Sequence, residues 1–199
     1  MRAPAWLACA CALALASLPT LAAGPEFLPA ARTYLVIADE QALWAKDADR
    51  PLPPASLTKL MTVLLALERL RPESIVTVGP AATHETGTRL GLERGDRLTA
   101  GDLAAAALVG SANDACQALA DEAAGNEARF VIMMNERARR WGLAQTHFGN
   151  ACGHDQPGHV ASARDLAALA QRALLSELAG GALVLKGHSA EVTSVAFSP

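Results

Sequence analysis

The sequence predicts a single helix-rich domain of the mixed α+β class, and three observations support this. Of the 199 residues, 51% are apolar but only 4% are aromatic, and alanine supplies most of the apolar surplus. Such a composition favours closely packed helices over an all-β sandwich. A compact β-type segment near the N-terminus is followed by several segments with helical spacing of apolar residues. The length suffices for one domain with a substantial core and does not clearly require two.

The first 23 residues have the pattern of a signal peptide. Arg2 supplies the positive charge, residues 6–18 are almost uninterruptedly apolar, and small residues surround a cleavage position near Ala22 or Ala23. The apolar run is too short for a membrane span, which needs about 20 residues. We therefore expect an exported chain with no clear membrane anchor. The alternative is a buried N-terminal helix.

A β-hairpin and a first helix follow the signal peptide. Residues 33–37 are rich in branched and aromatic side chains and predict a strand, with residues 42–49 as the returning strand after a short link. Prolines at positions 51, 53 and 54 end the hairpin. Leucines at helical spacing then predict a helix from Ser56 to near Arg71.

The rest of the chain predicts further helices joined by polar loops. Thr99 and Asp102 fit the capping signal of one helix, and Gly142 fits the glycine that ends another. The expected helices are 103–109, 114–123, 127–141 and 163–178; 75–78 is extended, 87–99 and 146–160 are loops, and 181–199 reads as strand.

Charge and cysteine content narrow the classes of partner. The net charge is −3 and the basic residues are scattered, which argues against nucleic acid as a partner.

Cys116 and Cys152 remain after removal of the signal peptide; an exported protein could join them as a disulfide, but a buried free thiol suits Cys116 equally well. Cys152, His154 and His159 lack standard zinc spacing, so we expect no metal and no cofactor.

The stretch PPASLTKLMT contains the first candidate for chemistry, Ser56 three residues before Lys59. On a helix these two side chains lie on one face, within hydrogen-bond reach. Serine becomes a nucleophile when a neighbouring base takes its proton, and a desolvated lysine can be neutral enough to do so. The Ser56 amide could form half of an oxyanion hole. The alternative is a capped helix with an exposed lysine, and the spacing alone favours it.

The stretch GSANDAC contains the second candidate, Ser111 and Asn113 between two apolar helices. A short turn there would be buried, and buried polar side chains must find partners. A hydroxyl that relays a proton and an amide that holds a substrate backbone would suit this position. An ordinary turn with Asn113 as a helix cap is the alternative.

Together these stretches resemble the serine D-alanyl-D-alanine carboxypeptidases, the low-molecular-mass penicillin-binding proteins, which are kin to the class A β-lactamases. SLTK matches S-x-x-K, and SAN is a variant of S-D-N. The segments YLVIADEQALWAKDADRPLPPASLTKLMT, TGTRLGLERGDRLTAGDLAAAALVGSANDAC and GHVASARDLAALAQRAL read like family segments in family order. The resemblance covers about residues 31–178 and implies a penicillin-binding-protein/β-lactamase-like transpeptidase fold.

The resemblance also implies a role for each candidate residue. Ser56 would be the acyl-accepting nucleophile, Lys59 its general base, Ser111 a proton relay and Asn113 a holder of the substrate's peptide amide. The implied substrates are peptidoglycan stem peptides ending in D-Ala-D-Ala, and β-lactams would acylate the same serine. The implied location is the periplasm or cell envelope.

The third family motif, K-T-G, does not occur in these residues, whose lysines are Lys46, Lys59 and Lys186. In the family the K-T-G motif lies on a strand, binds the substrate carboxylate and supplies the second oxyanion amide. Loss of one oxyanion donor costs about 2.7–4 kcal/mol in the barrier. We therefore expect impaired activity, and a fold truncated before its C-terminal sheet strands.

The final stretch, LKGHSAEVTSVAFSP, resembles the opening of a WD repeat, whose blades need about 40–45 residues. The expected division is 1–23 signal peptide, 24–180 carboxypeptidase-like domain and 181–199 WD-repeat-like fragment. The alternative function is an inactive penicillin-binding-like module fused to a truncated WD-repeat array. Because a lone hairpin would have open edges, we expect residues 192–197 to pair with it as an added strand.

Overall fold

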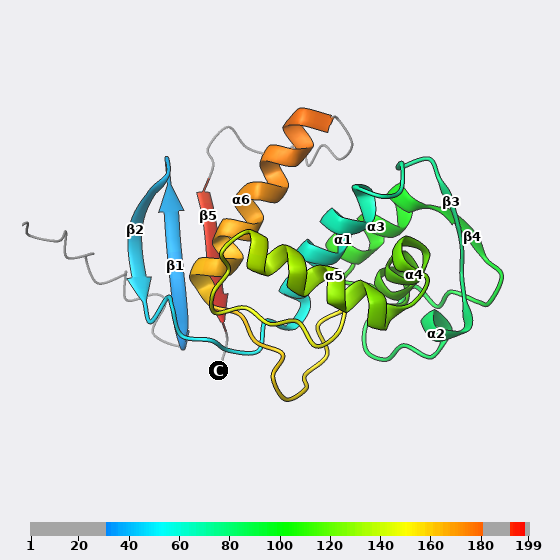
Figure 1. The fold of residues 1–199 in the computed structure, drawn as a ribbon, viewed down its shortest axis with the longest axis horizontal. Helices are drawn as coiled ribbons and strands as arrows, with labels where there is room; N and C mark the ends of the chain where they lie inside the picture. Colours follow the sequence, from blue (N-terminus) through cyan, green and yellow to red (C-terminus); the bar gives the residue numbers. More distant parts are fainter. Residues whose placement is uncertain (1–30, 181–191, 198–199) are drawn as a thin grey trace, which may run out of the picture.

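A computed structural model describes residues 31–180 and 192–197 of the chain. A sheet with helix α6 (Ala163–Gly180) beside it forms one side of the molecule, and the remaining helices form the other (Figure 1). Along the chain, the N-terminal strands of the sheet are followed by further α-helices and β-strands before α6. These are α1 (Lys59–Leu67), β3 (Ile75–Thr77), α2 (Pro80–Thr83), β4 (Arg97–Thr99), α3 (Ala100–Val109), α4 (Asn113–Ala124) and α5 (Glu127–Arg140). The mixed, helix-rich class expected from composition is confirmed.

The predicted hairpin is present as β1 (Thr33–Ala38) and β2 (Gln41–Lys46). Its turn is shorter than expected, because only Asp39 and Glu40 connect the strands. Both residues have positive φ, 49° and 63°, as two-residue turns that match the twist of a hairpin require. Aspartate, as at Asp39, is among the residues that adopt this backbone conformation more often than branched residues do.

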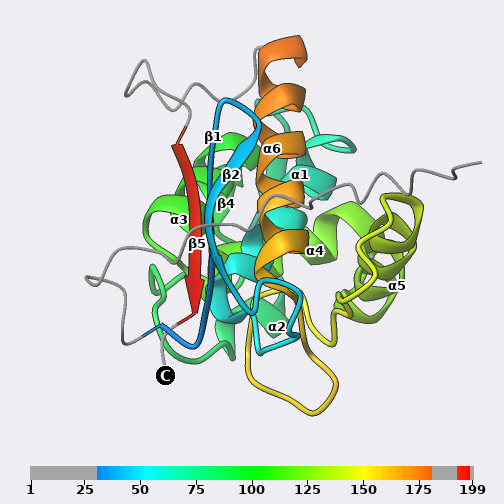
Figure 2. The same cartoon turned by 90° about the vertical axis from the view of Figure 1, so that its left-hand side faces the viewer.

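The other edge of β1 pairs with β5 (Val192–Phe197), giving the strand order β2-β1-β5. The pairing is antiparallel and runs from Thr33 opposite Phe197 to Ala38 opposite Val192. The expectation that residues 192–197 add a strand to the hairpin is therefore confirmed. Helix α6 lies against β1 and β5, behind the sheet when the sheet faces the viewer (Figure 2).

The helix predicted from Ser56 differs from the prediction at both ends. Residues Ala55–Thr58 form a 3₁₀ turn, α1 begins at Lys59, and α1 ends at Leu67 rather than near Arg71. Two preceding prolines cannot donate backbone hydrogen bonds, and Ala55 has a positive φ of 46°, so the chain enters the helix through a tight turn.

The caps of the later helices follow the sequence signals. Thr99 accepts a hydrogen bond from the Asp102 amide at the start of α3, and Gly142 follows α5 with φ of 69°. Helix α4 begins at Asn113, one residue earlier than predicted, and its N-cap residue is Ala112. The short helix α2 was not predicted, because its four residues are too few for a periodic pattern.

Helix α1 lies at the centre of the core and contacts α3, α4, α5 and α6. Alanines such as Ala66, Ala104, Ala107 and Ala115 are fully buried where helices meet, which explains the alanine-rich composition. Among the described residues, none of the helices combines the length and apolar character needed to cross a bilayer.

Candidate active site

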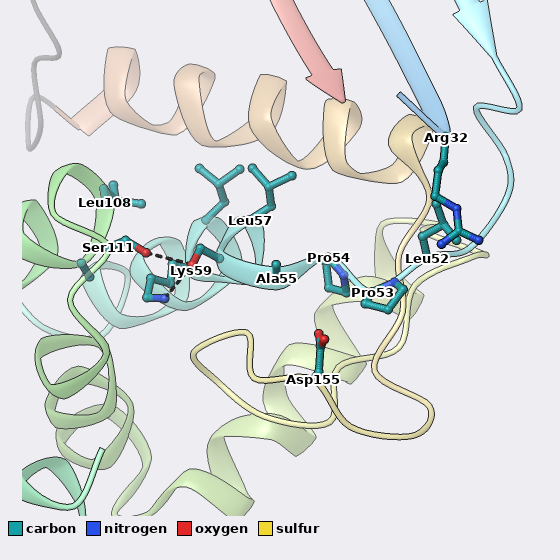
Figure 3. A pocket seen from close by; sticks show the side chains of 13 residues that line it. Arg32, Leu52, Pro53, Pro54, Ala55, Leu57, Lys59, Leu108, Ser111 and Asp155 are labelled. Carbon is teal, nitrogen blue, oxygen red and sulfur yellow. Dashed lines mark hydrogen bonds between the residues drawn. The ribbon is translucent and has the colours of Figure 1, made fainter. Parts of the chain in front are cut away.

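Ser56, Lys59 and Ser111 meet at one point of the molecule. The Ser111 hydroxyl donates a hydrogen bond to Ser56 Oγ at 2.8 Å, and Lys59 Nζ donates to the same oxygen at 3.3 Å. Both interactions appear as dashed lines that converge between the labelled Ser111 and Lys59 (Figure 3). The three side chains predicted as nucleophile, base and relay thus form one hydrogen-bonded cluster.

Local backbone structure explains this meeting. Because residues i and i+3 of a 3₁₀ turn eclipse each other, Ser56 and Lys59 project to the same side. Ser111 occupies the turn between α3 and α4 with a positive φ of 55°, a strained conformation for a residue with a side chain. That conformation aims its hydroxyl at Ser56 across 55 residues of chain.

Ser56 and Lys59 have opposite environments. Ser56 is exposed, whereas Lys59 is only 1% exposed. Lys59 also donates to the backbone carbonyl of Cys152 at 2.7 Å. Burial lowers the pKa of Lys59 below its ordinary value, while the charge of Glu85 opposes that shift. A dry lysine beside a solvent-facing serine is the arrangement in which a neutral amine can accept the serine proton.

Asn113 lies beside this cluster but is engaged with the fold. Its side-chain amide donates to the Thr86 carbonyl at 2.5 Å, and its backbone amide donates to the Thr88 carbonyl at 2.8 Å. The alternative in which Asn113 caps the helix is wrong, since Ala112 is the N-cap residue and no side-chain cap bond is made.

A cavity of about 720 Å³ opens in front of the cluster. Arg32 and Asp155 lie at the end away from Ser111 and Lys59 (Figure 3). Its lining is mostly apolar, and Asn113 is not among the described residues that line it: Arg32, Leu52, Pro53, Pro54, Ala55, Ser56, Leu57, Lys59, Leu60, Ala107, Leu108, Ser111 and Asp155. The space is large enough for a peptide end.

Two groups that support the site were not predicted from the sequence. Asp114 accepts hydrogen bonds from the amides of Leu90, Gly91 and Leu92 at 2.8–3.0 Å, which fixes the loop beside Asn113. An acidic residue in the first turn of a helix was the available signal. Nothing in the sequence marks the Cys152 carbonyl as part of the site, because every residue carries a backbone carbonyl.

Cys116 and Cys152 form a disulfide between α4 and the loop 150–154, so the alternative of a free thiol at Cys116 is wrong.

His159 is fully buried; its Nδ1 accepts from the Gly149 amide at 2.8 Å, and its Nε2 therefore donates to Thr58 Oγ1 at 2.9 Å. Burial lowers the pKa of His159, which keeps the ring neutral.

Solved structures with a similar fold define the class of protein. The D-alanyl-D-alanine carboxypeptidase DacD of Francisella tularensis matches with a TM-score of 0.71 and 25% identity, covering 79% of this chain and 40% of that one. Penicillin-binding protein D2 of Listeria monocytogenes, in its ampicillin-bound form, matches with a TM-score of 0.65 and 28% identity, covering 77% and 65%. The fold is that of the penicillin-binding DD-peptidases.

Sequence comparison then places the chain within that class. The model of the peptidase S11 family, described as D-alanyl-D-alanine carboxypeptidase, matches residues 23–191. DacD of Salmonella typhimurium is 40% identical over 148 residues, which are 69% of this chain and 38% of that protein. DacF of Bacillus subtilis is 36% identical over 140 residues, 68% and 36% of the two chains. The chain belongs to the D-alanyl-D-alanine carboxypeptidase family.

The extent of these matches bears on the C-terminal part of the chain. The chain spans less than two fifths of the length of the two curated relatives named above. The family match runs through residue 191 and so includes residues 181–191, which the sequence analysis assigned to a WD-repeat fragment. Residues 192–197 form β5 of the sheet. Neither the relatives nor the structures support a WD-repeat fragment or the inactive fusion built on it.

Proposed function

We propose that this chain carries the acylation centre of a serine-type D-Ala-D-Ala carboxypeptidase that acts on peptidoglycan stem peptides. The observation that carries the proposal is the convergence of Lys59 Nζ and Ser111 Oγ on Ser56 Oγ, at 3.3 Å and 2.8 Å. Membership of the carboxypeptidase family indicates the type of reaction, and the cluster of Ser56, Lys59 and Ser111 has the side chains that we propose perform it.

The proposed reaction has two steps. Ser56 Oγ attacks the carbonyl carbon between the last two D-alanines while neutral Lys59 takes the hydroxyl proton. The bond to the terminal D-alanine nitrogen breaks, and that nitrogen receives a proton through Ser111. Water then attacks the ester on Ser56, which releases the shortened peptide and restores the serine.

Further groups have proposed supporting roles. The Ser56 backbone amide, in the 3₁₀ turn, would donate to the oxyanion of the tetrahedral intermediate. Asn113 would hold the substrate's peptide amide with the acceptor oxygen of its side chain, because the donor end is engaged with Thr86. β-lactams are proposed as acylating inhibitors of the same serine.

The division of the chain and its destination are also proposals. Residues 1–23 have the signal-peptide pattern, and the family match begins at residue 23, which supports export to the periplasm or cell envelope. We further propose that the carboxypeptidase-like domain occupies residues 24–180 and continues into residues 181–191, where the family match still runs.

Release of D-alanine tests this function. The full chain is incubated with a pentapeptide ending in D-Ala-D-Ala, with the same peptide ending in L-Ala-L-Ala as substrate control. Because these 199 residues contain no K-T-G, we expect slow release from a polypeptide of this sequence, but release that requires the D-configuration and Ser56. Equal rates for wild type and Ser56→Ala would refute the proposal.

A further inference from the structure

The disulfide between Cys116 and Cys152 joins two parts of the site that are 36 residues apart in sequence. Cys116 lies in the first turn of α4, just after Asn113, and Cys152 lies in the loop 150–154. Both residues are buried, at 0% and 1% exposure. The bond therefore lies inside the structure.

The loop that carries Cys152 holds Lys59 through its backbone. The Cys152 carbonyl accepts from Lys59 Nζ at 2.7 Å, a shorter contact than the 3.3 Å from Nζ to Ser56 Oγ. The preceding carbonyl, of Ala151, accepts from Thr62 Oγ1 at 2.6 Å, and Thr62 lies three residues after Lys59 on α1. Two consecutive carbonyls of the loop thus accept hydrogen bonds from side chains of α1, and the Cys152 carbonyl orients Lys59.

The same loop packs against the backbone of the nucleophile. A Cβ built on Gly153 would collide with the Ala55 carbonyl and lie 3.0 Å from the Ser56 amide nitrogen. Displacement of the loop would therefore disturb Lys59 and Ser56 together.

We propose that the Cys116–Cys152 disulfide is a positioning device, which fixes the Cys152 carbonyl to α4 so that Lys59 points at Ser56. For its effect on acylation, this inference rests on the function proposed above. Besides the disulfide, hydrogen bonds from Thr62 Oγ1 to the Ala151 carbonyl at 2.6 Å and from the Ala151 amide to Glu127 at 2.9 Å hold the loop, as does the His154–Glu85 contact at 2.6 Å. These contacts preserve the loop's general place when the covalent link is absent, but none of them involves the Cys152 carbonyl itself.

Loss of the disulfide is expected to change the pKa of Lys59 in one direction. A loosened loop admits water to Lys59, and because burial is the main cause that lowers the pKa of Lys59, hydration raises that pKa toward the ordinary value of about 10.4. A smaller fraction of neutral lysine then remains at neutral pH to accept the Ser56 proton. Binding of the substrate before acylation does not involve this step and should change little.

The double variant C116S/C152S removes the covalent link with little change of shape. In the native geometry Cys116 Sγ lies 3.3 Å from the Ala151 carbonyl oxygen, and Cys152 Sγ lies 3.6 Å from the Asn113 carbonyl oxygen. Serine hydroxyls at these positions have acceptors in reach and need not remain unpaired. Val76→Ala, a cavity-forming change in the buried strand β3, serves as a control that lowers stability elsewhere.

Titration of the lysines tests the inference without any substrate. The chain contains three lysines, so labelling lysine side chains with ¹³C gives three signals for NMR, and Lys59→Arg identifies one of them. We expect the Lys59 pKa to rise in C116S/C152S and to stay at the wild-type value in Val76→Ala. Reduction of the wild type with a phosphine, which converts the disulfide to two thiols, gives the same comparison if the double variant fails to fold.

Acylation by a fluorescent penicillin supplies the second readout. We expect the first-order acylation rate of C116S/C152S to fall at least about tenfold, which is part of the roughly 10²–10⁴-fold that a positioned base contributes, with unchanged non-covalent affinity. An unchanged Lys59 pKa in C116S/C152S would overturn the positioning role and leave a disulfide that only stabilises the fold. A shifted pKa in a chain whose Ser56 is never acylated would instead refute the proposed function.

Discussion

Lys59 illustrates at the scale of one residue how the fold changes a side chain's chemistry. It is 1% exposed, three residues from an exposed serine, and its amine contacts a serine hydroxyl and a backbone carbonyl. An exposed lysine at this position would be protonated at neutral pH and could not accept a proton. The burial of Lys59 therefore excludes the exposed surface lysine that spacing alone favoured, and it supports the proposed role of Lys59 as general base.

Replacement of this lysine by methionine tests its buried state. We expect Lys59→Met to lower the acylation rate by about 10²–10⁴, the usual contribution of a general base.

Because the pKa of Lys59 is lowered in the folded chain, the unfolded chain binds more protons between that pKa and about 10.4, so wild-type stability should rise with pH in this window.

Denaturant unfolding of both proteins from pH 6 to 11 measures this difference. The slope of stability against pH in the alkaline window should be smaller in Lys59→Met than in wild type. Parallel slopes would show that Lys59 titrates as an ordinary exposed lysine.

Gly153 provides a second test at the residue scale. Its φ is 92°, and an added Cβ would collide with the Ala55 carbonyl beside Ser56, so we expect Gly153→Ala to displace the loop or the nucleophile and to slow acylation at least about tenfold. Gly158→Ala is the matched control, because Gly158 has a φ of 80° but nothing within 4 Å of the added Cβ. Similar acylation rates for the two variants would contradict the close packing against Ser56.

The sequence predicted the reacting side chains better than their supports. S-x-x-K and S-x-N are fixed spacings of side chains that do chemistry, so Ser56, Lys59 and Ser111 could be found from the sequence. The Cys152 carbonyl and the role of Asp114 depend on which backbone groups the fold brings near, and residue types do not encode that directly. The disulfide depended on a distance, 5.9 Å between the Cα atoms, which only the structure supplies.

At the scale of elements, the start of α4 organises the loop beside the site through Asp114. This carboxylate is 1% exposed; burial opposes its ionisation, but the amides of Leu92, Leu90, Gly91 and Ala115 together lower its pKa below the ordinary value. A carboxylate with a lowered pKa stabilises the folded chain above the unfolded value of about 3.9. That stabilisation is lost as the pH falls through the lower, folded pKa.

Asp114→Asn tests this support. We expect the variant to lose about 2 kcal/mol of stability at pH 7, because an amide nitrogen would face backbone donors in place of a carboxylate oxygen. The difference from wild type should shrink as the pH falls below about 3.9. Thermal unfolding between pH 3 and 7 measures it, and a constant difference over that range would rule out an ionised Asp114 as the source.

The pairing of strand β5 was predicted from its branched residues and from the open edge that a lone hairpin would have. Branched residues suggested a strand, and the antiparallel register with β1 confirms it. The end of α1 and the 3₁₀ turn before it were predicted less well, because apolar spacing continues past Leu67 and cannot distinguish 3.6 from 3.0 residues per turn over four residues.

Hydrogen exchange tests the pairing of β5. In the described sheet β5 has a neighbour only on the β1 side, so alternate amides of residues 192–197 should exchange slowly and the amides between them rapidly. Strand β2, on the other side of β1, should show the same alternation and serves as the internal reference. Uniformly rapid exchange across residues 192–197 would reject the added strand.

At the scale of the whole molecule, the cavity is formed by segments far apart in sequence. Arg32 before β1, the proline-rich entry to α1, the end of α3 and Asp155 all contribute to its lining. Helix-rich class and element order followed from composition and periodicity, but the sequence could not show that these segments enclose one space, because side-chain packing between distant segments determines its shape.

If Ser56 is the acylated nucleophile, the mass of the intact protein must increase after incubation with a penicillin. We predict an adduct of one penicillin molecule on the wild-type chain, located on Ser56 by peptide mapping and absent from Ser56→Ala. No adduct on the wild type, or an adduct that persists in Ser56→Ala, would contradict it.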